Sequence, residues 1–178
     1  MEISQEYLRE RVTYDPLTGL FAYNERPQSH FRISRACNAW NARFAGALTG
    51  TKDSRGHIQI KLDGKRYLAH RMAFLYMSGA IPEEVDNIDR NKTNNAWVNL
   101  RSADRSQNAA NREARGAYLT SSGRFRAQIC VNYKIVHLGT FDTESEAISA
   151  YQNASNRAFG QFSPYLHVAG REQKAELA

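Results

Sequence analysis

The stretch from residue 85 to residue 112, VDNIDRNKTNNAWVNLRSADRSQNAANR, constrains the fold of this chain more than any other part. It begins with a short predicted strand at 85–88. A polar loop at 89–95 follows, and its Asp, Asn, Lys and Arg content excludes it from a hydrophobic core. A second strand is predicted at 97–100, and then a polar helix from about Ser102, a residue type that caps helices. The predicted unit is strand, loop, strand and helix.

The side chains of this unit are mostly carboxamides, a carboxylate and arginines. Carboxylate and amide oxygens bind hard divalent cations, and arginine binds phosphate. The alternative interpretation is an ordinary asparagine-rich hairpin loop, because Asn and Asp are common in turns. The inventory therefore favours a site for a metal ion and a phosphate group.

The stretch resembles the HNH endonuclease motif, whose fold is the ββα-metal unit. In that family the first strand carries Asp-His: the Asp binds one divalent metal ion, and the His is the general base that takes a proton from the attacking water. An Asn of the second strand braces the loop, and a later Asn or His on the helix completes the metal site. By position, the matching residues here are Asp86, Asn87, Asn99 and Asn108.

The spacings also agree with phage-type members of that family. They are 12 residues from Asn87 to Asn99 (99 − 87) and 9 residues from Asn99 to Asn108 (108 − 99), and the flanking words AHRMAFLY and NLRSADRSQNAANR are similar as well. The resemblance implies that Asp86 and Asn108 are ligands of one divalent metal ion, Mg²⁺ or Mn²⁺, with Zn²⁺ as an alternative. It implies that Asn99 braces the loop.

The general-base position departs from the family, because Asn87 stands where the motif has His. A carboxamide does not titrate near neutral pH and cannot accept a proton as imidazole does. General-base catalysis is worth about 10²–10⁴-fold in rate, so the resemblance implies an inactive or strongly impaired nuclease. Two origins stay open: a lineage that lost its activity, and a deliberate replacement of the His. The otherwise intact motif favours the replacement.

The composition limits which kinds of binding partner and which cellular compartment are expected. A net charge of +6 and a pI of about 9.5 favour a polyanion, and nucleic acid more than a membrane, although a basic protein without such a partner is the alternative. No apolar run reaches the roughly 18 residues of a membrane helix, and the N-terminus lacks a signal-peptide core. The two cysteines, Cys37 and Cys130, cannot form a four-thiolate zinc site. We expect free thiols and a cytoplasmic protein, in the host cell if phage-encoded.

The chain before this stretch predicts small hairpins and helices. A short helix is expected at 3–11, and a hairpin at 12–23 whose phrase YDPLTGLF resembles the lead-in of phage HNH proteins. A second hairpin at 57–68 turns at Asp63-Gly64, and a helix follows at 69–78, ended by Gly79. At the start of that helix, His70 is expected to make a structural hydrogen bond to the ββα unit, with a ligand or phosphate role as the alternative.

Residues 24–46 have no clear period. Four arginines, among them Arg35, alternate with Phe31, Trp40 and Phe44. Arginines beside aromatic residues suit the backbone and bases of a nucleic acid. A solvated loop that places three aromatic side chains in the core is the alternative, and the two interpretations are compatible.

A boundary is predicted near residues 113–116, followed by strands at 116–119, 124–131 and 134–141 and a helix from 144 to about 159. A capping box, Thr143 with Glu146, starts the helix, whose predicted inner stripe is Ala147, Ala150, Tyr151, Ala154 and Ala158. Residues 124–131 alternate cleanly. One face of that strand has Phe125, Ala127, Ile129 and Val131, and the other has Arg124, Arg126, Gln128 and Cys130.

With its phrase HLGTFDTESEAISAY, the range 115–165 closely resembles the AP2/ERF DNA-binding domain, which lays its sheet in the major groove. The resemblance implies DNA contacts from Tyr118, Arg124, Arg126, Gln128, Lys134 and His137. We add Arg105, Arg112 and Arg35 as basic candidates. Many AP2 domains have Arg where this chain has Tyr118, so the base preferences of that family are not transferred. Arginine and glutamine on a sheet can reach guanine and adenine edges, and a solvated sheet face is the alternative.

The predicted fold class is α+β: an HNH ββα-metal unit with preceding hairpins and a helix, followed by a three-stranded antiparallel sheet and one helix. The predicted domains are 1–112 and 113–165, with a tail at 166–178. The predicted function is a metal-dependent HNH endonuclease of phage or homing type that hydrolyses double-stranded DNA. A single active site nicks one strand at a time, and nicking and double-strand cleavage both stay open. The alternative is a regulatory DNA-binding protein with a decayed nuclease site; an RNA-binding role has little support. A monomer and a homodimer both stay open.

Overall fold

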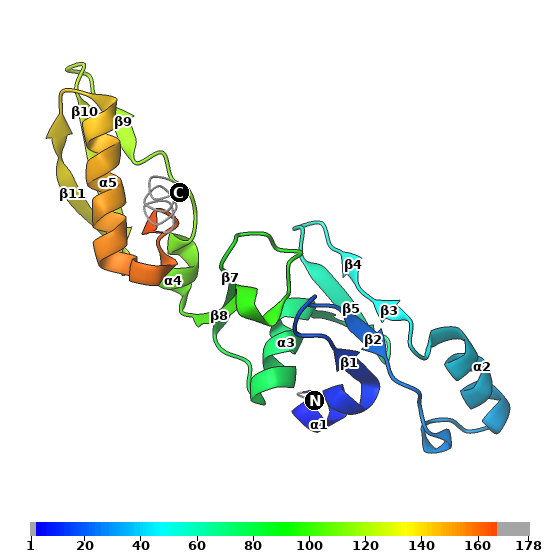
Figure 1. The fold of residues 1–178 in the computed structure, drawn as a ribbon. Helices are drawn as coiled ribbons and strands as arrows, with labels where there is room; N and C mark the ends of the chain where they lie inside the picture. The colour runs from blue at the N-terminus through cyan, green and yellow to red at the C-terminus, as the bar shows by residue number, and fades with distance from the viewer. Residues whose placement is uncertain (1–2, 167–178) are drawn as a thin grey trace, which may run out of the picture. The chain divides into compact units, whose positions relative to one another are not determined.

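The structure is a computed structural model that describes residues 3–166. The chain forms two compact units, Met1–Ser102 and Ala103–Ala178, and each mixes helices with small antiparallel sheets (Figure 1). The α+β class is therefore confirmed. The predicted boundary near residues 113–116 stays a prediction, as do the domain limits, and the predicted tail lies almost wholly outside the described residues.

The N-terminal unit begins with α1 (Gln5–Arg11) and a small sheet in the order β1-β2-β3. The predicted first hairpin is present, because β1 (Val12–Tyr14) pairs antiparallel with β2 (Phe21–Tyr23). The third strand, β3 (Leu48–Thr49), was not predicted. Between β2 and β3 the chain forms η1 (Gln28–His30) and helix α2.

Helix α2 (Ser34–Phe44) occupies the range for which the sequence showed no period. Its only buried residue is Cys37. Cys37, Trp40 and Phe44 recur at i, i+3 and i+7, so the helix has a narrow apolar stripe that the sequence analysis missed among the surrounding Arg and Asn residues. Both cysteines are free in the part of the chain that the structure describes, with Cys37 buried and Cys130 exposed.

A second sheet, in the order β4-β5-β6, follows. Its strand β4 (Thr51–Lys52) was not predicted, whereas the hairpin of β5 (Ile58–Leu62) and β6 (Lys65–Leu68) was. The turn residues Asp63 and Gly64 have φ values of +44° and +85°, the two positive angles that a type I′ hairpin turn requires. Helix α3 (Ala69–Ser78) comes next and ends at Gly79 in the left-handed conformation, as predicted.

One hydrophobic core joins α1, both sheets, α3 and the start of the HNH-like stretch. Its fully buried members include Leu8, Val12, Phe21, Ile60 and Leu62. Val85 and Leu100 belong to the same core. The strands that carry the candidate site are therefore anchored by apolar packing at both ends of the polar loop.

The HNH-like stretch contains β7 (Glu84–Asn87) and β8 (Leu100–Ala103), which form a two-stranded sheet. The strand predicted at 97–100 is wrong for its first three residues, which form the 3-10 turn η2 (Trp97–Asn99). The cause is tertiary: the Trp97 ring packs on Phe74 at 4.8 Å, and Val98 is 81% exposed rather than facing a core.

The helix after β8 is also shifted from its predicted start. Helix α4 (Arg105–Ala110) is capped by Asp104, not by Ser102, which lies inside β8. Asp104 and Gln107 form a capping box with two reciprocal hydrogen bonds of 2.8 and 2.9 Å. Two such bonds satisfy more of the unpaired helix-end amides than a single serine cap can.

The C-terminal unit has the predicted sheet, in the order β11-β10-β9, with antiparallel pairing throughout. Its strands are β9 (Ala117–Leu119), β10 (Phe125–Val131) and β11 (Lys134–Phe141). Helix α5 (Glu144–Phe159) packs on this sheet, and the short η3 (Gly160–Phe162) follows (Figure 1). The predicted capping box of Thr143 and Glu146 is present.

Small residues set the contact between α5 and the sheet. Ala117, Ala127 and Ala147 are completely buried there, which lets the helix lie close to the strands. The predicted inner stripe of α5 is wrong at Ala158, which is exposed. Ser155 is buried instead, and its hydroxyl lies 2.9 Å from that of Ser163, so a hydrogen bond replaces apolar packing near the end of the helix.

The turn between β1 and β2 packs directly against the end of the polar loop. Gly19 has φ +75°, and a Cβ atom there would lie 2.2 Å from the carbonyl carbon of Asn95. The Tyr14 hydroxyl donates to the Asn95 carbonyl oxygen at 2.7 Å, and the Trp97 amide donates to the Pro16 carbonyl oxygen at 2.8 Å. The first hairpin therefore helps to shape the loop.

We predict that Gly19→Ala lowers the free energy of unfolding more than Gly46→Ala does. Both glycines have φ near +75°, so both substitutions carry the cost of about 1–2 kcal/mol for a left-handed L residue. At Gly46 no described atom lies within 4 Å of the added Cβ, whereas at Gly19 the clash should add about 1–3 kcal/mol. Urea denaturation of both variants measures the difference, and equal losses would contradict the close contact.

Candidate functional site

The polar loop is closed by the side chain of Asn99, which is 7% exposed. Its Oδ1 accepts from the Asp89 amide at 3.0 Å, and its Nδ2 donates to Asp89 Oδ1 and to the Asn94 carbonyl oxygen, both at 2.8 Å. One carboxamide thus joins the two ends of the loop. Buried polar groups are costly to leave unpaired, so this network specifies one loop conformation.

Asn87 lies at the end of β7 and is 7% exposed. Its Nδ2 donates to the same Asn94 carbonyl oxygen at 2.8 Å. The Nδ1–H of a histidine often donates to a backbone carbonyl in this way, which leaves Nε2 as the proton acceptor. Asn87 therefore makes the tethering bond that an imidazole could make, but it has no atom that accepts a proton near neutral pH.

Asp86 precedes it and is 5% exposed. The Arg101 guanidinium binds its carboxylate: Nε and Nη2 lie 2.7 and 2.6 Å from Asp86 Oδ2. Sequence reasoning did not single out Arg101. The available signal was the need of a buried carboxylate for a charged partner, but the sequence contains many arginines and does not say which one meets it.

The donors that the structure brings together are oxygen-rich and lack a cluster of strong metal ligands. In the described part of the chain, no group of three or more His, Cys, Asp and Glu side chains could hold a metal ion. The Asp86 carboxylate suits a hard cation, and it would share its charge between that cation and Arg101. Asn108 lies on α4 of the other unit, so its pairing with Asp86 stays a prediction.

His70 lies in the first turn of α3, 5% exposed, and its ring centroid is 5.0 Å from that of His57. The Nδ1 atoms of both rings are buried and have no hydrogen-bond partner among the described residues. The hydrogen bond to the ββα unit that we predicted for His70 has no counterpart at Nδ1. Burial, together with the nearby His57 and Arg71, lowers the pKa of His70 to about 4.

In the C-terminal unit, strand register places four of the predicted DNA contacts on one face. Tyr118 is opposite Arg126 across β9 and β10, and Gln128 is opposite His137 across β10 and β11. This face is the one away from the buried Ala127 and Ile129. The alternation predicted for β10 is therefore confirmed, while the DNA contacts stay a prediction.

The remaining predicted contacts are more scattered. Arg124 is exposed, and its Nε lies 2.8 Å from Asp142 Oδ1. Lys134 is opposite Val131, so it lies on the same face of the sheet as Ala127 and Ile129, at the end of the strand pair. Arg35 is exposed on α2. Arg105, in the first turn of α4, and Arg112 are exposed as well.

Residues 67–110 match the family model of the HNH endonuclease. This match supports an HNH nuclease domain. It runs from the end of β6 through α3, β7, η2 and β8 to α4, and so includes Asp86, Asn87, Asn99 and Asn108. HNH nucleases generally use a divalent metal ion, and the domain implies a nucleic acid substrate. The match ends before the C-terminal sheet, so the resemblance to AP2/ERF domains stays a prediction.

Searches of curated proteins and of solved structures give no match to this chain. Among the described residues, no helix is long and apolar enough to cross a membrane.

We predict that the buried His70 makes the protein less stable in mild acid. Its pKa of about 4 lies below the ordinary 6.5, so the unfolded chain binds the proton more tightly than the folded one. The contribution of neutral His70 to the free energy of unfolding is fully present above pH 6.5. It is lost as the pH falls toward 4, and the total loss is about 3 kcal/mol. Thermal unfolding at several pH values should show this loss, which His70→Gln should reduce. His137→Gln, at an exposed position, is the control, and an unchanged pH dependence in His70→Gln would contradict the assignment.

Proposed function

We propose that this chain is a metal-dependent HNH DNA endonuclease, of phage or homing type, whose general-base position is occupied by Asn87. The observation that carries the proposal is the hydrogen bond from Asn87 Nδ2 to the Asn94 carbonyl oxygen, within the loop that Asn99 closes. The same carbonyl oxygen could orient a histidine at this position, and a histidine would supply the proton acceptor that Asn87 lacks. The chain should bind its substrate normally and cut it very slowly.

Each residue of the site has a defined part in this proposal. Asp86 and Asn108 would hold one divalent ion, Mg²⁺ or Mn²⁺, through oxygen, and Arg101 orients the Asp86 carboxylate. The bound ion would neutralise the charge that develops on the scissile phosphate. Asn99 keeps the loop closed, and Asn87 can orient a water molecule but cannot take its proton.

Double-stranded DNA is the proposed substrate. The net charge of +6 attracts a polyanion. On the C-terminal sheet, Arg126 is exposed and Gln128 is half-buried, and both lie on the same face. These side-chain types reach guanine and adenine edges in the major groove. The N-terminal unit contains the strands and the loop of the proposed nuclease.

The second candidate is a regulatory DNA-binding protein with a decayed nuclease. The loop network argues against it. A site without selection for catalysis would be expected to lose more than one of its buried polar partners, yet Asn99 retains three hydrogen bonds and Asp86 retains its arginine.

We predict that Asn87→His gives a protein that nicks supercoiled plasmid in the presence of Mg²⁺ or Mn²⁺. The expected gain over the present chain is about 10²–10⁴-fold, the usual contribution of a general base. Because the imidazole can keep the bond to Asn94, the substitution should leave the fold unchanged.

The matched control is the same revertant with Asp86→Ala, which should bind no metal ion at the site by calorimetry and should not nick. If the revertant binds DNA and metal but does not cut, the decayed DNA-binding protein becomes the better explanation. If the present chain already cuts as fast as the revertant, another group supplies the base, and His70 would be tested first.

We predict that Arg126→Ala weakens binding to duplex DNA by about 1–3 kcal/mol. Arg126 is exposed on the outer face of the sheet, opposite Tyr118. Arg157→Ala is the matched control, because it removes the same charge from an exposed position in the last turn of α5. Fluorescence anisotropy with a labelled duplex measures both, and equal losses would show that only net charge matters.

A further inference from the structure

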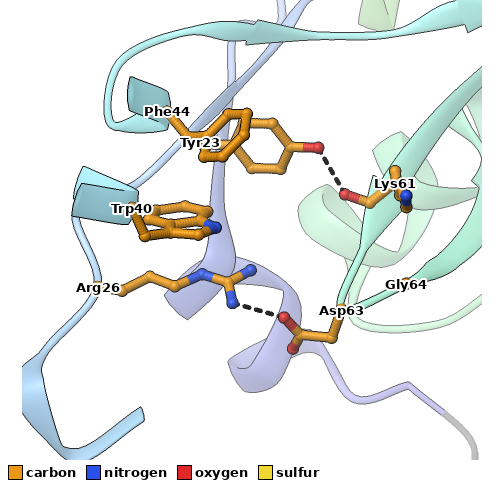
Figure 2. Close-up of a pocket in the computed structure, with 7 residues that line it drawn as sticks. All are labelled: Tyr23, Arg26, Trp40, Phe44, Lys61, Asp63 and Gly64. Atoms are coloured by element: carbon orange, nitrogen blue, oxygen red, sulfur yellow. Dashed lines mark hydrogen bonds and ion pairs between the residues drawn. The ribbon is translucent and has the colours of Figure 1, made fainter. Parts of the chain in front are cut away.

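The N-terminal unit contains a cavity of about 300 Å³ outside the HNH-like stretch. It lies between the segment that joins β2 to β3, residues 24–47, and the β5–β6 hairpin (Figure 2). Tyr23, Trp40 and Phe44 line one side together with Arg26, which stacks on the Trp40 ring. Lys61, Asp63 and Gly64 of the hairpin line the other side (Figure 2).

The aromatic side of the cavity is a cluster of half-buried rings. The Trp40 and Phe44 centroids are 5.3 Å apart, and Tyr23 lies 5.8 Å from Trp40 and 6.2 Å from Phe44, with edge-on or tilted geometry. All three side chains stay partly accessible rather than filling the core. Together they form an apolar wall of aromatic rings along the cavity.

The polar side is rigidly held. The Arg26 guanidinium lies 4.2 Å from the centre of the Trp40 ring, and its Nη1 is 2.6 Å from Asp63 Oδ1. Asp63 also accepts from Arg11 Nε at 3.0 Å. The Tyr23 hydroxyl donates to the Lys61 carbonyl oxygen at 2.7 Å, which ties the aromatic cluster to the hairpin (Figure 2). Contacts within the protein thus hold the lining in place, and ligand sites are usually largely preformed.

The cavity has a small excess of positive charge. Its charged lining residues are Arg26, Lys61 and Asp63, a net charge of +1 (2 − 1), and Asp63 pairs with Arg26, which leaves Lys61 as the cation of the lining that is not paired with Asp63. Exposed Lys61 lines the cavity, and exposed Arg43 lies with its guanidinium 5.1 Å from the centre of the Phe44 ring. An aromatic ligand that enters would therefore bring adjoining negative groups close to cations.

We propose that this cavity receives a single unstacked nucleobase of the bound DNA strand. The inference rests on the proposed function, since it assumes that DNA is the ligand of the chain. The volume lies at the lower end of the roughly 300–1,000 Å³ of small-molecule sites, which suits one ring system. Aromatic side chains and arginine planes are the surfaces on which unpaired bases stack, and the phosphates on either side of the base would meet Lys61 and Arg43.

A base inside a regular duplex cannot enter, because it is paired and stacked. The cavity therefore favours DNA with an accessible base, such as single-stranded DNA, a mismatch or a flipped nucleotide. It should give the protein a preference for these substrates over a fully paired duplex of the same length.

The tryptophans allow a direct test in the full chain. The protein has two, and Trp97 packs on Phe74 outside the cavity. In Trp97→Phe, the emission comes from Trp40 alone, and a short single-stranded oligodeoxynucleotide should quench it. In Trp40→Phe, the emission comes from Trp97, and the same oligonucleotide should leave it unchanged.

A second pair of variants measures affinity. Phe44→Leu keeps the wall apolar but removes the ring, and should weaken single-strand binding about tenfold, within the range expected for one stacked base, while duplex binding stays the same. Phe31→Leu is the matched control. The Phe31 ring centroid lies 6.3 Å from that of Trp40, but Phe31 does not line the cavity.

Two results would overturn the proposal in different ways. Binding of the single strand without a change in Trp40 emission, or with full affinity in Phe44→Leu, would show that bases stay outside the cavity, and the proposed nuclease function would be unaffected. Failure of the chain to bind any DNA would overturn both proposals together.

Discussion

The shape of the candidate site depends on two backbone carbonyl groups in the polar loop. The Asn94 carbonyl oxygen accepts from Asn87 and from Asn99, and the next one, of Asn95, accepts from the Tyr14 hydroxyl. A carbonyl oxygen has two lone pairs, so the Asn94 oxygen is fully used. The loop is thereby held from β7, from η2 and from β1 at once. A loop rich in polar residues would otherwise be held weakly, since it buries little apolar surface of its own.

Ion pairs with arginine likewise fix carboxylate side chains in the N-terminal unit. Asp86 is paired with Arg101, and Asp63 with Arg11 and Arg26. Burial raises the pKa of Asp63, but hydrogen bonds from Tyr7, Arg11 and Arg26 outweigh it and hold that pKa at about 2. These arginines are mostly buried and fix the conformation of their partners. Other arginines, such as Arg35 and Arg43, remain on the surface. Structural cations and cations available to a polyanion are thus different residues, and net charge alone does not distinguish them.

Features with local causes could be predicted from the sequence. The Asp63-Gly64 turn, the capping box at Thr143 and the alternation along β10 each depend on residues a few positions apart. Helix α2 was missed although Cys37, Trp40 and Phe44 recur at helical spacing, because this sparse stripe lies in a range rich in Arg and Asn. The start of β8 was misplaced because Trp97 has a partner, Phe74, more than twenty positions away, which no local pattern reveals. The Asp86–Arg101 pair and the aromatic cavity likewise need the tertiary fold, since their members come from different elements.

The bond from Asn87 to the Asn94 carbonyl has a consequence for how such a protein can evolve. Asparagine and histidine codons differ only in their first base, and both side chains can donate to the same carbonyl. In the proposed nuclease, the gain and the loss of catalysis are therefore separated by a single nucleotide change that leaves the loop folded. A lineage could pass through the inactive form without losing the fold or DNA binding, and return from it.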